Sequence, residues 1–168
     1  MKVGVVTFPG TLDDRDAARA ATHAGTTAVS LWHGDADLKG VDAVILPGGF
    51  SYGDYLRCGA ISRFAPVMEK IIDAANGGMP LLGICNGFQT LVRMGILPED
   101  KRLAALGHND GGVFDCRWIE MEPVSKKCIW TRNLNENIHC PIAHGEGRFT
   151  AGSSTVSALL RNDQIALR

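Results

Sequence analysis

The sequence has 168 residues, an apolar fraction of 45% and a formal net charge of −1 at pH 7. A chain of this length is expected to bury one core, and its balanced charge gives no indication of a nucleic-acid partner. No apolar run approaches the ~18 residues of a membrane span, and the N-terminus lacks the charged and apolar regions of a signal peptide. We therefore expect a cytoplasmic protein without membrane association, with residues 1–168 in a single domain.

The cysteines point to the same compartment. Five are present, an odd number without a Cys-x-x-Cys pair. This pattern argues against a disulfide framework and against a zinc site, and it favours a reducing environment. We expect no metal in this chain, whose cysteines are at positions 58, 85, 116, 128 and 140.

The first half of the chain alternates strand and helix patterns. Thr11 is a candidate cap for the first helix, and Asp13 and Asp14 suit its first turn. Residues 59–75 carry apolar side chains at helical spacing, which predicts one buried helix face that includes Phe64. Four apolar runs predict strands at residues 2–8, 27–32, 41–46 and 81–84.

This alternation predicts an α/β fold in which a mostly parallel sheet is covered by helices on both faces. After residue 106 the pattern changes to a turn-rich loop and then to alternating apolar and polar residues, which indicates an added antiparallel portion. Its strand candidates are residues 113–121, 127–131 and 138–142.

Residues 83–87 read Gly-Ile-Cys-Asn-Gly and lie between an apolar run and a helix-like stretch. A nucleophile on a sharp turn between a strand and a helix forms a nucleophile elbow. The glycines are required where a Cβ would crowd the turn. The helix N-terminus is expected to favour the thiolate of Cys85, and its N–H groups can hold an oxyanion. The alternative interpretation is a buried, inert cysteine near a tight turn.

A second loop supports the catalytic interpretation. The run 41–46 leads into Pro-Gly-Gly-Phe at residues 47–50. Backbone N–H groups in such a turn have no side chain in front of them. In a parallel sheet this loop and the elbow both emerge at the carboxyl ends of strands, where open α/β sheets place their sites. The alternative is a glycine-rich surface loop.

Three segments together resemble the class I glutamine amidotransferases, and among them the glutaminase subunits of phosphoribosylformylglycinamidine synthase, which act in purine biosynthesis. They are residues 46–60, residues 83–89 and the string Ala-His-Gly-Glu-Gly-Arg-Phe at 143–149; the opening, residues 3–11, also fits. The elbow and the Pro-Gly-Gly turn are shared by the whole class, whereas residues 50–60 and 144–149 are more specific to these subunits.

The resemblance implies a three-layer, flavodoxin-like fold of the class I glutaminases. It implies that Cys85 attacks the side-chain amide of glutamine and that ammonia passes to a large synthase subunit, where ATP and Mg are used; a small accessory subunit is a further partner. The oxyanion is expected to be held by N–H groups of Gly49 or Phe50, beside Gly48, and of Asn86. The chain itself is expected to need no cofactor.

One departure from the family concerns the general base. The family completes its triad with His-Pro-Glu near its C-terminus, and no His-Pro-Glu occurs here. We therefore expect a glutamine amidotransferase domain whose C-terminal part is missing. His144 and Glu146 have the same His-x-Glu spacing, but the family carries His-Gly-Glu-Gly in addition to its triad, which assigns these residues to another position.

Other polar residues have two interpretations each. Gln89 lies one helical turn beyond Cys85 and either contacts glutamine or is solvated. Asn109 is either a site residue or a loop residue. Asp54 and Arg57 either form a surface ion pair or contact the large subunit. His23 and His33 are expected to be surface residues, since neither has polar neighbours in sequence.

Two other function classes remain open at this stage. Without a triad the chain could serve as a docking subunit that binds its partner without hydrolysing glutamine. It could also be another α/β protein with a cysteine elbow, related to proteases or chaperones. The intact elbow and oxyanion loop favour an enzyme.

Overall fold

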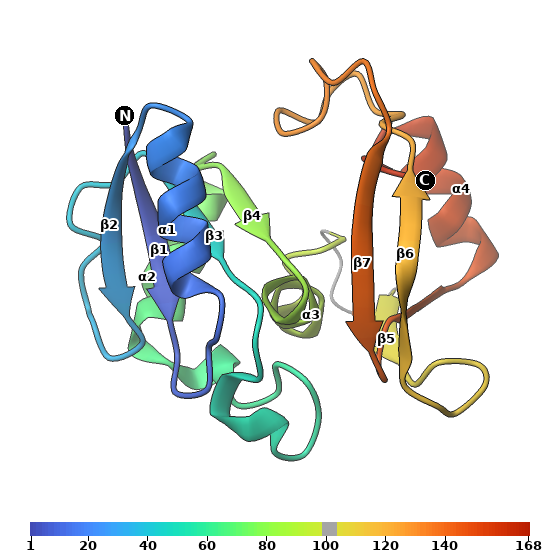
Figure 1. Ribbon diagram of the computed structural model, residues 1–168, viewed down its shortest axis with the longest axis horizontal. Coiled ribbons are helices and arrows are strands. Elements are labelled where there is room, and N and C mark those ends of the chain that lie inside the picture. The colour runs from blue at the N-terminus through green and yellow to red at the C-terminus, as the bar shows by residue number, and fades with distance from the viewer. Residues whose placement is uncertain (99–103) are drawn as a thin grey trace. The chain divides into compact units, whose positions relative to one another are not determined.

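The computed structural model describes residues 1–98 and 104–168. The chain divides into two compact units, Met1–Leu97 and Pro98–Arg168 (Figure 1). Each unit is described by itself below.

The first unit contains a four-stranded sheet in the order β2-β1-β3-β4, with every neighbouring pair parallel. The register places Val5 beside Ile45 and Leu46 beside Gly83. This order is that of the flavodoxin-like fold, as the sequence predicts. The strands are β1 (Lys2–Thr7), β2 (Thr27–Trp32), β3 (Ala43–Leu46) and β4 (Leu81–Gly83).

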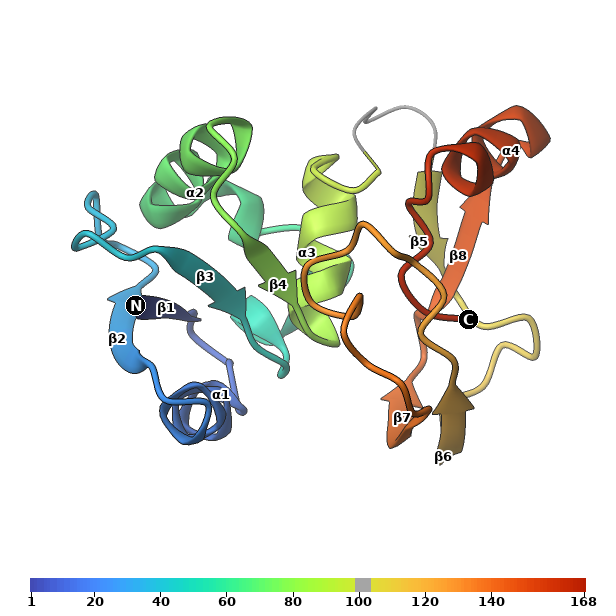
Figure 2. The ribbon, with the colours of Figure 1, turned by 90° about the horizontal axis from the view of Figure 1, so that it is seen from above.

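Helices cover both faces of this sheet, which confirms the expected three layers. Helix α1 (Asp14–His23) lies on one face, whereas α2 (Pro66–Asn76) and α3 (Asn86–Met94) lie on the other (Figure 2). The α1 face buries Val3, Val5, Ala17, Ala21 and Ile45. The other face buries the larger cluster, including Val6, Leu31, Val44, Leu46, Met68, Ile71 and Leu91.

The start of α1 differs from the prediction. Thr11 does not cap the helix; its hydroxyl accepts a hydrogen bond from the Phe8 N–H at 2.9 Å. The N-cap is Asp13, whose side chain makes no capping hydrogen bond. Local sequence could not reveal this, because Thr11 is recruited into a turn that also bridges to Gly49.

The predicted helix over residues 59–75 begins later than expected. A short 3₁₀ turn, η2 (Ser62–Phe64), ends at Ala65, which is extended with ψ 136°, and α2 starts at Pro66. A residue before proline is pushed out of the helical region, and proline is favoured at the first helical position. The Phe64 side chain is therefore 72% exposed and does not lie on a buried helix face.

The second unit contains two antiparallel strand pairs, β5 (Ala104–Gly107) with β8 (Arg148–Ala151) and β6 (Asp115–Met121) with β7 (Ile138–His144). They confirm the antiparallel portion. The helix α4 (Ser153–Arg161) follows β8. The strand predicted at 127–131 is wrong: Thr131 and Arg132 donate to the Cys128 carbonyl, which closes turns there.

The final residues lie against the segment after β6. Leu167 forms an antiparallel bridge with Pro123, and Glu122 and Arg168 exchange backbone hydrogen bonds. Among residues 1–98 and 104–168, no helix has the length and apolar character needed to cross a membrane.

Candidate active site

Cys85 occupies the apex of the turn between β4 and α3. Its backbone has φ 51° and ψ −111°, a conformation that residues other than glycine rarely adopt. The Ile84 N–H donates to the Leu46 carbonyl and the Gly87 N–H to the Ile84 carbonyl, both at 2.9 Å. The elbow is thus fixed to the end of β3, and the side chain of Cys85 is exposed.

The flanking glycines are required by close packing. A Cβ on Gly87 would lie 2.0 Å from the Leu46 carbonyl oxygen, and a Cβ on Gly83 would lie 2.9 Å from the backbone of Gly87. Any side chain at these positions would push α3 away from β3 and β4. The predicted reason for the two glycines is therefore confirmed.

The loop after β3 pairs with the loop after β1. Leu12 donates to the Gly48 carbonyl at 3.2 Å, and the N–H of Phe50 donates to the Gly10 carbonyl at 2.9 Å. Gly49 has φ 136°, and a Cβ there would lie 2.5 Å from the Leu12 nitrogen. The chain can take this path only with glycine at position 49.

This pairing decides which N–H groups face the thiol. The backbone N–H groups of Asn86 and Gly49 lie beside the Cys85 sulfur and act to lower the pKa of its thiol, whereas the N–H of Phe50 donates to the Gly10 carbonyl. Of the two alternatives left open by the sequence, the geometry therefore favours Gly49 over Phe50 as the loop donor. One donor comes from the loop and one from the start of α3, as an oxyanion hole requires.

The thiol of Cys85 does not have the lowered pKa that the helix N-terminus predicts. Burial of the sulfur raises the pKa above its ordinary value, and the carboxylates of Asp13 and Asp54 raise it further, whereas the N–H groups of Asn86 and Gly49 offset part of this rise. Desolvation and nearby negative charge both disfavour the thiolate. The helix terminus acts in the expected direction but is outweighed.

The side chain of Asn86 joins the two loops of the site. It is buried, and its Oδ1 accepts from the N–H of Ser51 at 3.0 Å and from the Ser51 hydroxyl at 2.6 Å. Its Nδ2 donates to Asp54 Oδ1 at 3.0 Å and to Gln89 Oε1 at 3.1 Å. Asn86 therefore supplies a backbone donor and also holds the neighbouring loop in position.

Gln89 and Asp54 are both brought to this network, as their positions near the motifs suggested. Asp54 lies in the 3₁₀ segment η1 (Ser51–Asp54), with φ 52°, and its Oδ2 accepts from the Cys58 thiol at 3.2 Å. The carboxylate of Asp54 is therefore held inside the loop by hydrogen bonds from Asn86 and Cys58.

The two histidines of the first unit differ. His23 is exposed, as predicted. The prediction for His33 is wrong, because its Nδ1 lies 2.8 Å from the Tyr52 hydroxyl and its ring contacts those of Trp32 and Tyr52. The partner Tyr52 lies 19 residues away, so the sequence neighbourhood of His33 carries no sign of it.

The remaining candidates, Asn109, His144 and Glu146, lie together in the second unit. The Asn109 amide donates to the His144 and Val113 carbonyls at 2.8 and 3.0 Å, and its Oδ1 is 3.0 Å from His144 Nδ1. A Glu146 carboxylate oxygen lies 3.8 Å from His108 Nδ1. The Asn109 amide thus orients His144, and these contacts stabilise the loop that contains them.

Two residues of the site, Asp13 and Ser51, carry no signature in the sequence that reveals their roles. Asp13 reads as a first-turn acidic residue, yet a Cβ on Gly48 would lie 2.3 Å from its Oδ2 and 3.4 Å from Cys85 Cβ. Ser51 reads as a loop residue, yet it is buried at 2% exposure against Asn86. Among the described residues, no cluster of three or more His, Cys, Asp or Glu side chains could hold a metal ion.

Comparison with known proteins shows the family of this chain. Residues 1–168 match the family of CobB/CobQ-like glutamine amidotransferase domains. The chain is 57% identical over 171 residues to the phosphoribosylformylglycinamidine synthase subunit PurQ of Rhodococcus jostii, covering 99% of this chain and 73% of that protein. It is 52% identical over 169 residues to the same subunit of Mycobacterium tuberculosis, with the same coverage of each chain.

Solved structures have a similar fold. The structure of PurLQS from Thermotoga maritima contains a chain that matches with a TM-score of 0.82 and 38% identity over 90% of this chain and 70% of that one. A glutamine amidotransferase from the same organism matches with a TM-score of 0.59 at 19% identity, over 91% of this chain and 64% of that one, and supports the fold alone. This chain belongs to the glutamine amidotransferase family and, within it, to the PurQ subunits of phosphoribosylformylglycinamidine synthase.

Proposed function

We propose that this chain is the glutaminase component of a phosphoribosylformylglycinamidine synthase and that Cys85 is its nucleophile. The observation that carries the assignment is the strained elbow that holds Cys85 at the start of α3 and against the end of β3, where the backbone N–H groups of Gly49 and Asn86 favour its thiolate. Strain of this kind persists where the surrounding structure requires it and is typical of catalytic sites. A docking module that binds without catalysis would not need this arrangement.

The chemistry follows from the site. The Cys85 sulfur attacks the side-chain amide carbon of glutamine, and the carbonyl oxygen becomes an oxyanion held by the N–H groups of Gly49 and Asn86. The C–N bond then breaks, a proton is transferred to the nitrogen, and ammonia leaves a thioester. Water hydrolyses the thioester to glutamate and restores the thiol. Gln89, tied to Asn86, is placed to contact the substrate.

Proton transfer in both halves of this reaction requires a general base. His144 is a weak candidate because, by resemblance, the family carries the His-Gly-Glu-Gly string in addition to its triad. We assign Asn109, His144 and Glu146 to the stabilisation of the second unit, where Asn109 binds His144. By resemblance to the family, the base is the histidine of a His-Pro-Glu motif, which residues 1–168 do not contain.

The ammonia has a defined use in this family. The relatives are named as subunits of phosphoribosylformylglycinamidine synthase, and one structure is that of PurLQS. We propose that a large synthase subunit receives the ammonia and aminates formylglycinamide ribonucleotide, using ATP and Mg, and that a small accessory subunit completes the complex. We place this activity in the cytoplasm, with residues 1–168 forming part of one amidotransferase domain.

Labelling with a glutamine-mimicking electrophile tests the assignment. A chloroketone or diazoketone analogue of glutamine should modify Cys85 in the complex, and excess glutamine should protect it. Peptide mass spectrometry separates this site from the other four cysteines, all of which are free. Modification that falls mainly on Cys58 or Cys140 would overturn the assignment, as would labelling at Cys85 that glutamine fails to reduce.

A further inference from the structure

Asp13 lies beside the elbow although it belongs to another element. It is the N-cap of α1, yet its side chain makes no capping hydrogen bond. The carboxylate is turned toward Gly48 instead: a Cβ on Gly48 would lie 2.3 Å from Asp13 Oδ2 and 3.4 Å from Cys85 Cβ. The Asp13 N–H also donates to the Gly48 carbonyl, at 3.3 Å. The Asp13 carboxylate, which could cap α1, therefore lies beside Gly48 at the candidate site instead.

Two negative charges act on the thiol among the described residues. They are the carboxylates of Asp13 and Asp54, both of which raise the pKa of Cys85. Within α3 the charged residue is Arg93, in the last turn, far from the elbow. In α1, the Asp14 carboxylate accepts a hydrogen bond from the Thr7 hydroxyl.

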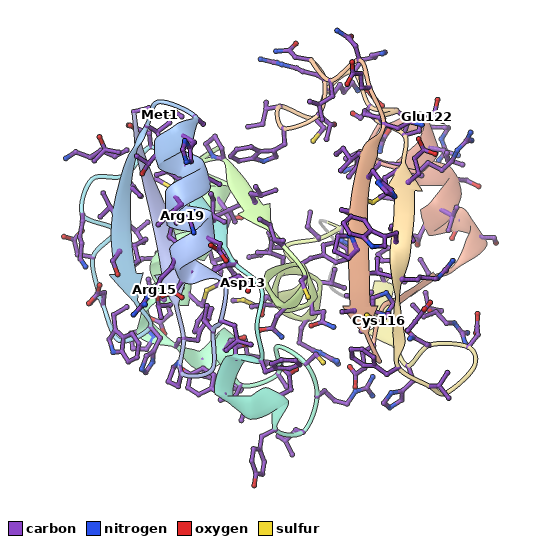
Figure 3. The ribbon with its side chains drawn as sticks, in the orientation of Figure 1. Met1, Asp13, Arg15, Arg19, Cys116 and Glu122 are labelled. Carbon is purple, nitrogen blue, oxygen red and sulfur yellow. The ribbon has the colours of Figure 1, made fainter. Side chains whose placement is uncertain are left out.

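Two further basic residues belong to the segments beside the site. Figure 3 shows Asp13 at the start of α1 and Arg15 on the other side of that helix end. Arg57 follows Asp54 along its loop. The carboxylates of Asp13 and Asp54 and the two N–H donors act on the pKa of the Cys85 thiol in opposite directions.

We propose that Asp13 is a positioning residue that acts as an electrostatic restraint on the nucleophile, disfavouring the thiolate of Cys85. This inference rests on the proposed function, in which Cys85 attacks glutamine as a thiolate. A neighbouring negative charge disfavours ionisation, because thiolate and carboxylate repel each other.

Asp54 cannot be replaced with as little structural change as Asp13. Its two carboxylate oxygens accept hydrogen bonds from Asn86 and Cys58, so part of its charge is compensated and its removal would disturb the loop. Asp13 is exposed and its carboxylate makes no capping bond, so it can be replaced with little structural cost. Asp13 is therefore the residue through which the restraint can be tested.

The test is the pH dependence of Cys85 alkylation by iodoacetamide, in which the thiolate sulfur forms a bond to carbon and iodide leaves. Asp13→Asn and Asp13→Ala should each lower the midpoint by about 0.3 to 1 pH unit. At pH 7.5 the rate should rise by about 1.4- to threefold, less than the thiolate fraction does, because nucleophilicity falls with pKa. Asp16→Asn, which removes the same charge from the same helix, is the matched control and should leave the midpoint unchanged.

Ionic strength gives a second measurement. Salt screens exposed charges, with a Debye length of about 10 Å at 0.1 M and 3 Å at 1 M. The midpoint of the parent protein should fall as salt is added, whereas that of Asp13→Ala should move less. If the role of Asp13 were purely structural, its replacement would change neither the alkylation midpoint nor the salt dependence of that midpoint in this way.

The outcomes separate this inference from the assignment of the nucleophile. If both Asp13 variants fold and keep the parent midpoint within 0.1 pH unit, the restraint is overturned, whatever the labelling by glutamine analogues shows. If the midpoint shifts for Asp16→Asn as much as for Asp13→Ala, the effect is one of net charge and the inference fails. If the midpoint shifts only for Asp13 but glutamine does not protect Cys85, the restraint holds and the proposed function fails.

Discussion

Asn86 and Ser51 are 35 residues apart, yet the Asn86 side-chain oxygen accepts two hydrogen bonds from Ser51, from its hydroxyl at 2.6 Å and its N–H at 3.0 Å. Both residues are buried. The pair connects the start of α3 with the loop that carries Gly49, so it fixes the separation of the two donors that face Cys85. A small change in this separation would misplace an oxyanion hole.

The two residues of this pair should respond differently to substitution. Ser51→Ala removes one hydrogen bond and should cost about 1 kcal/mol in unfolding free energy, with a modest loss of glutaminase rate. Asn86→Ala leaves the buried Ser51 N–H without its acceptor and should cost about 2–4 kcal/mol, with a loss of rate of roughly 10²-fold or more. Denaturant unfolding and steady-state kinetics of the complex measure both. Equal effects of the two changes would contradict this account.

Cys85→Ala should abolish glutamine-dependent synthesis by the assembled complex and leave ammonia-dependent synthesis intact. The reason is that the substitution removes the nucleophile but not the partner that uses ammonia. The comparison is made with saturating glutamine and with an ammonium salt at high pH. Cys58→Ala is the control and should keep most of the glutamine-dependent rate. Loss of the ammonia-dependent reaction in Cys85→Ala would instead indicate a failure of assembly.

Gly49→Ala should lower the glutaminase rate by about 10²-fold or more, because the added Cβ would meet the Leu12 nitrogen at 2.5 Å and force the loop to move. Gly53→Ala is the matched control. It also has positive φ, 68°, but its Cβ would meet nothing closer than 3.8 Å. The left-handed conformation at position 53 costs an alanine about 1 kcal/mol, and no atom crowds its Cβ, so this control should keep the donor. Binding of the partner should be unchanged in both, as measured by co-purification.

Alkylation of Cys85 should require a higher pH than alkylation of an ordinary thiol. Burial and the two carboxylates raise the pKa of Cys85, so its thiolate accumulates only as the pH rises beyond about 8.5, the usual value. A short cysteine-containing peptide, alkylated under the same conditions, provides the comparison. A Cys85 midpoint below that of the peptide would contradict the direction of the shift.

His144→Ala should act on stability rather than on chemistry. It removes the hydrogen bond to Asn109 and should lower the unfolding free energy by about 1 kcal/mol. Asn109→Ala should cost more, because its amide also binds the carbonyls of Val113 and His144 and the N–H of Gly147. Thermal unfolding measures both. A loss of 10³-fold or more in the glutaminase rate of a folded His144→Ala protein would identify His144 as the general base.

Much of the first unit could be predicted from the sequence because its signals are local. Apolar runs mark the strands, and the glycines at 83 and 87 mark a turn where no Cβ fits. The errors occur where a competing turn or a proline overrides the helix or strand preference of a segment. Thr11 binds Phe8 rather than capping α1, and proline at position 66 delays a helix that the apolar spacing alone would start at 59. The 127–131 segment is apolar enough for a strand but lies in turns.

The sequence by itself determined the fold class, the elbow at Cys85 and the family. These depend on short motifs and on periodicity, which one stretch of chain carries alone. Only the tertiary structure decided that Gly49 and not Phe50 faces the thiol, that Asn86 holds Ser51, and that Asp13 lies beside Gly48. The physical reason is that hydrogen bonding and charge act over a few ångströms. Which groups come within that range is set by how β1, β3 and α3 end at the same edge of the sheet.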